Sequence, residues 1–185
     1  SISERFIAKF LEHARTIKVG IGSDPGVDMG PLGSKKRISA MHEMIADAKS
    51  KGAEVALGGS ASEEFSKGYF FQPTVLTNVK SDMVVMTEET FGPVAPIATF
   101  SNLEEVIQMA NSTPYGLAGF IFTSDLNSAL QIGLRLEVGM VGINNLTIAT
   151  AEAPFGGVKS SGFGREGGAE GIEEFLITIF SPGLA

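Results

Sequence analysis

The chain of 185 residues contains no cysteine and no tryptophan, and it has only two histidines. The lack of cysteine excludes disulfides, thiolate metal sites and any cysteine nucleophile supplied by this chain. His13 and His42 both fall within apolar patterns of helical spacing. We expect them to be solvent-facing helix residues, so the sequence predicts no metal site.

Basic residues are also scarce, because 14 lysines and arginines stand against 21 acidic residues and the net charge is −7. A protein that binds nucleic acid needs clustered cations, so no nucleic-acid partner is predicted. No stretch is apolar and long enough to span a bilayer, and residues 1–10 lack the layout of a signal peptide. These absences predict a soluble, cytoplasmic protein with no membrane partner. Hydrophobic residues make up 43% of the chain, enough for a buried core.

The second half of the chain alternates apolar runs with helical patterns. The runs 94–100, 116–123 and 138–144 indicate strands, and apolar faces at helical spacing lie between them at 103–110 and 126–133. Strand and helix alternating at these lengths predict βαβ units, and therefore an α/β fold with an open parallel sheet and flanking helices. Glycines within the strands are expected to permit close approach of neighbouring backbone or ligand. They are Gly116, Gly119, Gly139 and Gly142.

The first half has fewer regular patterns. Apolar positions from Phe6 to Ile17 predict a helix that Ser1 or Ser3 caps and that ends before Gly20. A second helix is predicted over 38–48, with Gly52 as its stop signal. Short strands are expected at 54–57, 69–71 and 74–76.

The run EETFGP at residues 88–93 is the first candidate site. The Glu89 carboxylate accepts two hydrogen bonds at once, which suits a vicinal diol such as two ribose hydroxyls. Phe91, two residues later, lies on the same side of an extended chain and suits contact with a flat ring. The alternative is a solvated glutamate pair and a core phenylalanine at the entry to a strand.

Two further candidates lie near the end of the chain. The glycine-rich stretch 154–166 is long for a loop in a compact domain, and Phe155 and Phe163 suit the walls of a pocket. Its alternative is a surface connection whose phenylalanines pack onto the core. Asn144 follows an expected parallel strand, at the end where α/β sheets bind ligands. Its alternative is a residue that turns the chain.

Several segments, in this order, resemble the carboxyl-terminal half of the aldehyde dehydrogenase superfamily. They are EETFGPV, NSTPYGLAGFIFT and EAPFGGVKSSGFGREGG, with DMGPL and GYFFQPTVL in the connecting portion. The resemblance covers essentially the whole chain, and within the superfamily it is similar to the succinate-semialdehyde dehydrogenases. It implies the open α/β catalytic domain of that family.

The resemblance implies oxidation of a small-molecule aldehyde with NAD or NADP, through a cysteine thiolate and a glutamate-activated water. By motif match, Glu89 would hold the nicotinamide ribose hydroxyls and Phe91 would press on the nicotinamide. Phe155 would line the aldehyde tunnel, with Asn144 and Thr150 near its entrance. Succinate semialdehyde is the expected substrate, and the choice between NAD and NADP stays open.

The family's cysteine, glutamate base and dinucleotide-binding region precede a segment like SISERFIAKF. We therefore expect no catalytic residue in this chain, and no dehydrogenase activity from it alone. The resemblance divides the chain into a partial catalytic domain, 1–166, and a carboxyl-terminal helix and oligomerisation strand, 167–185. The β-prone run 175–180 is followed by Ser-Pro-Gly at 181–183. A homo-oligomer is expected through this strand, the alternative being an edge strand of its own domain.

Two other functions remain open at this stage. One is a stand-alone, non-catalytic module that serves as an oligomerisation unit or scaffold. The other is an acyl-transfer enzyme with a serine or Lys159 as nucleophile, for which the sequence shows no partner base. A substrate with a carboxylate tail calls for an arginine or a hydroxyl cluster. Thr147 and Thr150 offer hydroxyls, whereas Arg165 is expected to be structural.

Overall fold

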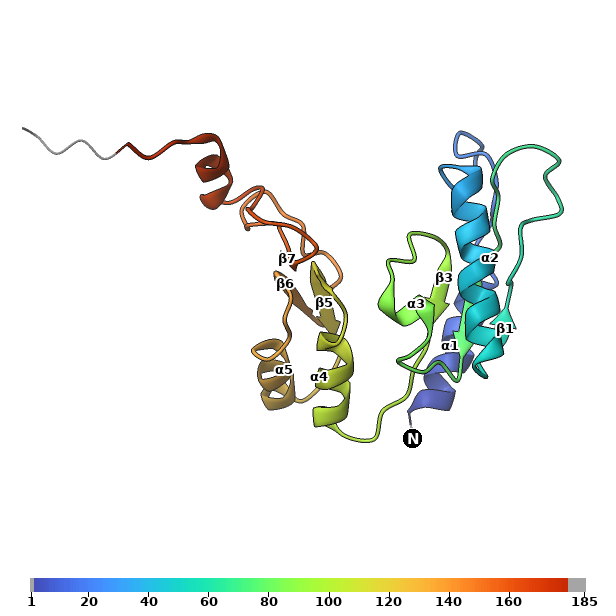
Figure 1. The fold of residues 1–185 in the computed structure, drawn as a ribbon, viewed down its shortest axis with the longest axis horizontal. Coiled ribbons are helices and arrows are strands. Elements are labelled where there is room, and N and C mark those ends of the chain that lie inside the picture. Colours follow the sequence, from blue (N-terminus) through green and yellow to red (C-terminus); the bar gives the residue numbers. More distant parts are fainter. Residues whose placement is uncertain (1, 180–185) are drawn as a thin grey trace, which may run out of the picture. The chain divides into compact units, whose positions relative to one another are not determined.

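The computed structural model describes residues 2–179 and divides the chain into two compact units, 1–100 and 101–185 (Figure 1). Within the described residues, no helix combines the length and apolar character needed to cross a bilayer. The division after residue 100 reflects packing, and the functional boundary predicted after residue 166 stays a prediction.

The first unit joins three helices to a three-stranded sheet. The helices are α1 (Ser3–Ala14), α2 (Lys35–Ser50) and α3 (Val84–Thr87), and the strands are β1 (Glu54–Leu57), β2 (Thr74–Thr77) and β3 (Val94–Pro96). Strand β2 lies in the middle, antiparallel to β1 and parallel to β3. The predicted strand at 69–71 is reduced to one isolated bridge between Ala61 and Phe71.

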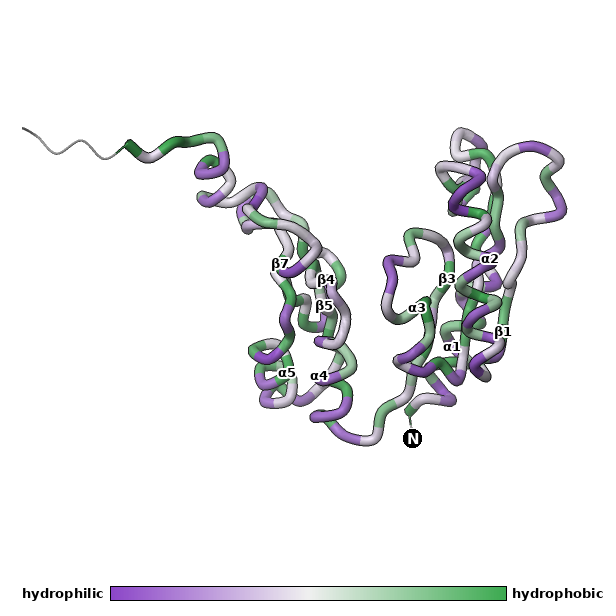
Figure 2. Tube along the Cα trace, viewed as in Figure 1, coloured by the Kyte–Doolittle hydropathy of each residue, from purple (hydrophilic) through white to green (hydrophobic). Residues whose placement is uncertain are grey.

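The core of this unit forms between α2 and the sheet. Met41, Met44, Ile45 and Ala48 are buried on one face of α2, at the spacing that one side of a helix requires. They join Leu76 of β2, which is fully buried, and burial of such a side chain contributes about 1.5–3 kcal/mol. The alternating colours along α2 in Figure 2 show this two-sided character. The predicted second helix is therefore confirmed.

The start of α1 differs from expectation. The residue at its N-cap position is Ile2, and the Phe6 amide donates to the Ile2 carbonyl over 2.9 Å. Ser3 is thus already the first helical residue and is not the cap, while Ser1 lies outside the described residues. The helix ends at Ala14, before Gly20 as predicted. Apolar spacing located the helix, but the backbone hydrogen bonds begin earlier than a serine cap requires.

The second unit contains the confirmed βαβ arrangement. Its elements are α4 (Leu103–Asn111), β4 (Tyr115–Gly116), β5 (Ala118–Ile121), α5 (Leu126–Gly133), β6 (Met140–Ile143), β7 (Val158–Lys159) and the 3-10 helix η1 (Glu170–Phe175). Strands β5 and β6 are parallel with α5 between them in sequence, whereas β4 pairs antiparallel with β7. The α/β class with open sheets is confirmed.

The single parallel sheet predicted across the second half is not formed. Strand β3 covers only Val94–Pro96 of the run 94–100 and pairs with β2, so it belongs to a different sheet from β5 and β6. Pro96 lacks a backbone N–H, which weakens the strand's ability to continue a ladder. An apolar run predicts that a strand forms. It does not predict which strand it pairs with, because that depends on packing against distant parts of the chain.

The predicted strand over 175–180 is also absent in its described part. Residues 176–179 have no regular secondary structure, and Leu176, Ile177 and Ile179 are all exposed. Figure 2 shows this hydrophobic segment at the end of the described chain. Phe180 and residues 181–183 lie outside the described residues. A β-prone segment becomes a strand only when another strand accepts its hydrogen bonds.

Candidate functional site

The 88–93 turn leads from α3 to β3 and carries the first predicted pair. The Glu88 amide closes α3 by donating to the Val84 carbonyl over 2.9 Å, and the chain then becomes extended. Both Glu88 and Glu89 are exposed, and Phe91 is 73% exposed. Phe91 is therefore not a core residue, so the alternative of a packed phenylalanine at a strand entry does not apply.

The backbone of this turn has an unusual conformation at Phe91, whose φ is 40°. A positive φ in an aromatic residue costs about 1–3 kcal/mol and persists only where surrounding contacts enforce it. The Arg37 guanidinium of α2 donates to the Thr90 carbonyl just before it. Just after it, Gly92 lies so close to α2 that an added Cβ would be 2.4 Å from the Met41 sulfur.

A cleft of about 690 Å³ opens beside the turn within the first unit. Its lining is almost entirely apolar, with Arg37 as the charged member among the described residues. The other lining residues are Met29, Gly30, Pro31, Leu32, Gly33, Phe71, Phe91, Gly92 and Pro93. An exposed carboxylate two positions before an exposed ring, at the edge of an apolar cleft, fits a ligand that joins a diol to a flat ring.

Asp47 of α2 anchors the helix that precedes the turn. Its carboxylate accepts from the Val84 amide at the start of α3 over 2.8 Å and forms an ion pair with Lys51 over 2.8 Å. The hydrogen bonds from Lys51 and from the Val84 amide lower the pKa of Asp47 below its usual 3.8. Folding therefore favours the ionised form of the Asp47 carboxyl group over its protonated form.

A pH dependence of stability follows from this anchor. Because the folded pKa of Asp47 is depressed, its contribution is complete above about pH 4 and is lost as the pH falls through the folded value. We expect Asp47→Asn to lower the urea midpoint at pH 7, and the difference from the native chain to shrink at pH 3 and below.

Asp82→Asn is the matched control, since its side chain makes no such bond to α3 in the described chain. Urea midpoints at the two pH values check the expectation. A deficit of Asp47→Asn that stays the same at both would contradict it.

In the second unit, hydrogen bonds between its own residues hold the glycine-rich 154–166 loop in place. Phe155 and Glu166 form an antiparallel bridge, with N···O distances of 2.6 and 2.8 Å. The Arg165 guanidinium donates to the carbonyls of Gly157 and Gly164 over 2.9 and 2.6 Å. The expectation that Arg165 is structural is confirmed, because its hydrogen bonds fix the backbone of the loop.

Lys159 joins this loop to the segment before β4. Its Nζ donates to the carbonyls of Asn111 and Thr113 over 2.8 and 3.3 Å and pairs with Glu137 over 2.6 Å. The loop also comes very close to β6, because a Cβ on Gly139 would be 1.9 Å from the Gly156 carbonyl oxygen. The predicted close approach is confirmed at Gly139, which lies just before β6 and not within a strand.

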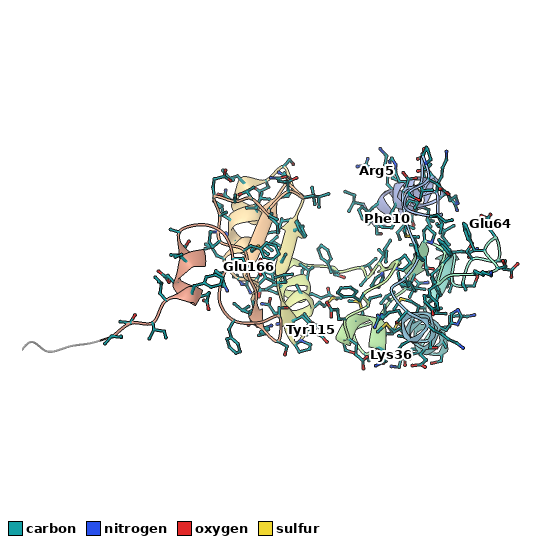
Figure 3. The ribbon with its side chains drawn as sticks, turned by 90° about the horizontal axis from the view of Figure 1, so that it is seen from above. Arg5, Phe10, Lys36, Glu64, Tyr115 and Glu166 are labelled. Atoms are coloured by element: carbon teal, nitrogen blue, oxygen red, sulfur yellow. The ribbon has the colours of Figure 1, made fainter. Side chains whose placement is uncertain are left out.

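Two of the predicted substrate residues share a hollow of about 370 Å³ within the second unit. Thr150 and Phe155 line it together with Glu166, which Figure 3 labels on the loop. Phe163 lines a different hollow and is fully exposed. The loop therefore offers Phe155, but not Phe163, as a partner to Thr150.

Asn144 has a structural task in the described chain. Its side-chain oxygen accepts from the Thr123 amide over 3.0 Å, and its amide group donates to the Thr123 carbonyl over 2.8 Å. Its φ of 53° turns the chain after β6. These bonds match the alternative of a turning residue, and a role in substrate binding stays a prediction.

The predicted residues thus fall into two groups, Glu89 and Phe91 in the first unit and Thr150 with Phe155 in the second. That both groups face one crevice stays a prediction. Sequence reasoning missed Arg37. A signal existed, because basic residues in the first turn of a helix oppose the helix dipole, and α2 has no acidic residue there. Among residues 2–179 there is no cluster of three potential metal ligands.

Comparison with known proteins supplies the family. The sequence profile described as "Aldehyde dehydrogenase family" matches residues 1–179. The chain belongs to the aldehyde dehydrogenase family. It is 44% identical to a succinate-semialdehyde dehydrogenase [NADP(+)] of Schizosaccharomyces pombe, over 96% of this chain and 36% of the relative. It is 45% identical to the Escherichia coli succinate-semialdehyde dehydrogenase [NADP(+)], over 95% of this chain and 36% of that protein.

Solved structures agree with this aldehyde dehydrogenase assignment. An Escherichia coli NADP-dependent enzyme has a TM-score of 0.91 at 44% identity, covering 95% of this chain and 36% of its own. Betaine aldehyde dehydrogenase from Staphylococcus aureus, solved with NAD+, has a TM-score of 0.90 at 39% identity, covering 95% and 35%. The chain spans about a third of the length of the relatives that it matches.

Proposed function

We propose that this chain forms the nicotinamide-facing and aldehyde-facing part of an NAD(P)+-dependent aldehyde dehydrogenase. The observation that carries the proposal is the 88–93 turn, which presents Glu89 and Phe91 beside an apolar cleft in a chain of this family. The relatives named for NADP(+) and the neighbour solved with NAD+ support a nicotinamide cofactor without choosing between the two.

The proposed roles follow from the chemistry of each side chain. The Glu89 carboxylate accepts hydrogen bonds from the two ribose hydroxyls, and the exposed ring of Phe91 lies against the nicotinamide and limits its orientation. When bound, NAD(P)+ supplies the hydride acceptor. Phe155 and Thr150 shape the hollow proposed for the aldehyde, where an apolar wall excludes water and a hydroxyl offers one hydrogen bond.

The nucleophile must come from outside these 185 residues, because they contain no cysteine. From the order of the resembling segments, we propose that this chain corresponds to the carboxyl-terminal part of an aldehyde dehydrogenase, downstream of the catalytic cysteine. On this proposal the chain alone does not oxidise aldehydes.

Succinate semialdehyde is the proposed substrate, as a short aldehyde with an anionic tail. Several relatives at about 44% identity are named for it. A Pseudomonas putida relative at 45% identity is named for 3-sulfolactaldehyde, which ends in a sulfonate instead of a carboxylate. The shared feature of these substrates is an anionic group on a short chain. The cytoplasmic location expected from the sequence stays a prediction.

Replacement of Glu89 tests the cofactor site. In the enzyme that contains this chain, Glu89→Gln keeps the shape but loses charge-assisted acceptance of two hydroxyls, so we expect NAD(P)+ affinity to fall about tenfold or more. Quenching of the enzyme's fluorescence on titration with NAD(P)+ measures this affinity. Glu88→Gln, next to it and equally exposed, is the matched control and should leave the affinity unchanged. Equal effects of both variants would refute the proposed role of Glu89.

Assembly into a homo-oligomer is also proposed, through the apolar segment at the end of the described chain. Residues 176–179 expose three large aliphatic side chains and have no strand partner among the described residues. A second copy could supply that partner by strand pairing. Sedimentation equilibrium would detect the assembly, and a strictly monomeric chain would argue against it.

A further inference from the structure

Helix α2 touches the 88–93 turn at two points that bracket its strained residue. Arg37 and Met41 are four residues apart, so they lie one above the other on the same face of the helix. Arg37 binds the carbonyl that precedes Phe91, and Met41 packs against the backbone of Gly92 that follows it. The positive φ of Phe91 is therefore held from both sides by one rigid element.

The Arg37 contact is polar, directional and partly buried. Its guanidinium donates through Nη2 to the Thr90 carbonyl, 53 positions away in sequence. Its Nε is buried and finds no hydrogen-bond partner within the described residues. Leaving a buried donor unpaired is unfavourable, and a cation in the first turn of a helix opposes the dipole. Both costs are offset at this position by a contact that fixes the turn.

We propose that Arg37 is a positioning residue that, through the Thr90 carbonyl, holds Glu89 and Phe91 in the orientation that a nicotinamide riboside requires. The inference rests on the proposed function of the 88–93 turn. The Thr90 carbonyl belongs to the peptide that joins Thr90 to Phe91, so holding it restrains ψ of Thr90 and φ of Phe91, two of the torsions that set the Phe91 ring relative to Glu89. Arg37 acts on the cofactor through this peptide and is not itself a catalytic residue.

The test replaces Arg37 in the intact enzyme. Arg37→Met keeps most of the side-chain length and removes the donors, and we expect about a tenfold loss of affinity for nicotinamide mononucleotide. Affinity for AMP, which probes the adenosine half, should stay unchanged. Arg37→Lys retains one donor and should restore part of the loss. Lys36→Met is the matched control, because Lys36 precedes Arg37 on α2 and is exposed (Figure 3).

A merely structural role predicts a different pattern. Loss of helix stability would lower the unfolding midpoint and the affinity for both halves of the cofactor, and Arg37→Lys would not rescue the nicotinamide half selectively. Hydrogen exchange of the 88–93 amides gives a second readout. Exchange should quicken in Arg37→Met but not in Lys36→Met, even if binding is too weak to measure. Unchanged exchange in Arg37→Met would overturn the proposal.

Combining Arg37→Met with Glu89→Gln distinguishes a failure of the proposed role of Arg37 from a failure of the proposed function of the 88–93 turn. If Arg37 acts through Glu89, the double variant should be little worse than either single variant, because interacting residues are non-additive. A loss in Glu89→Gln without a loss in Arg37→Met would overturn the role of Arg37 alone. No loss of nicotinamide mononucleotide affinity in Glu89→Gln would overturn the proposed function, and with it this inference.

Discussion

Residues 1–185, purified alone and given succinate semialdehyde with NAD+ or NADP+, will form no NADH or NADPH above the buffer blank. The proposed chemistry needs a thiolate to attack the aldehyde carbon before hydride can leave it, and the chain has no cysteine. Loss of the nucleophile in an enzyme with covalent catalysis lowers kcat by about a millionfold. Absorbance at 340 nm follows the reaction directly.

The control is the same assay on an enzyme that contains these residues together with the segment that supplies the cysteine. That protein should turn over, and its activity should be abolished by a thiol-alkylating reagent. Turnover by the 185-residue chain, in material of a single intact mass that alkylation leaves active, would mean that another residue is the nucleophile.

Gly139→Ala should destabilise the second unit by about 3 kcal/mol or more. The new Cβ would be 1.9 Å from the Gly156 oxygen and 2.8 Å from the Gly156 carbonyl carbon. Both are backbone atoms of the 154–166 loop, so no side-chain rotation relieves the overlap. The loop must move away from β6, and the hydrogen bond from the Gly139 amide to the Gly116 carbonyl, 3.0 Å long, is expected to weaken with it.

Gly133→Ala supplies the matched control in the same unit. Its Cβ would meet only side-chain atoms, at 3.6 Å on Val141 and 3.8 Å on Ile121, which are ordinary contact distances. Gly133 ends α5, where alanine is a better helix former, so stability should stay equal or rise by about 0.5–1 kcal/mol. Urea unfolding monitored by circular dichroism measures both variants. Similar midpoints for the two would contradict the close approach at Gly139.

Patterns that depend on neighbouring residues were predictable from the sequence. The apolar spacing of α2 located the helix and its buried face, and Gly52, with its φ of 99°, follows its end as expected. The βαβ unit of β5, α5 and β6 was also predictable. Parallel strands need a long crossover connection, and the helical pattern between the two apolar runs provides one. Glu89 and Phe91 were proposed from chemistry and resemblance together, and their role at a cofactor stays a prediction.

Contacts between distant parts of the chain were not predictable in the same way. The apolar run that begins at Val94 does not encode that its partner is β2. From the sequence, Asn144 could bind a ligand or turn the chain, and only its hydrogen bonds to Thr123 show that it turns the chain. Arg37 is separated from Thr90 by 53 positions, and only the unfavourable placement of a cation at a helix start hinted at it.

The surroundings of Lys159 bear on which chemistry this chain can perform. A nucleophile must present a lone pair to its substrate. The Lys159 amine instead directs three hydrogen bonds at the oxygens of Asn111, Thr113 and Glu137. No direction is left from which it could attack an acyl group. An acyl-transfer reaction that uses this lysine as its nucleophile is therefore disfavoured. Lys159 instead links the loop to the segment before β4 and to Glu137.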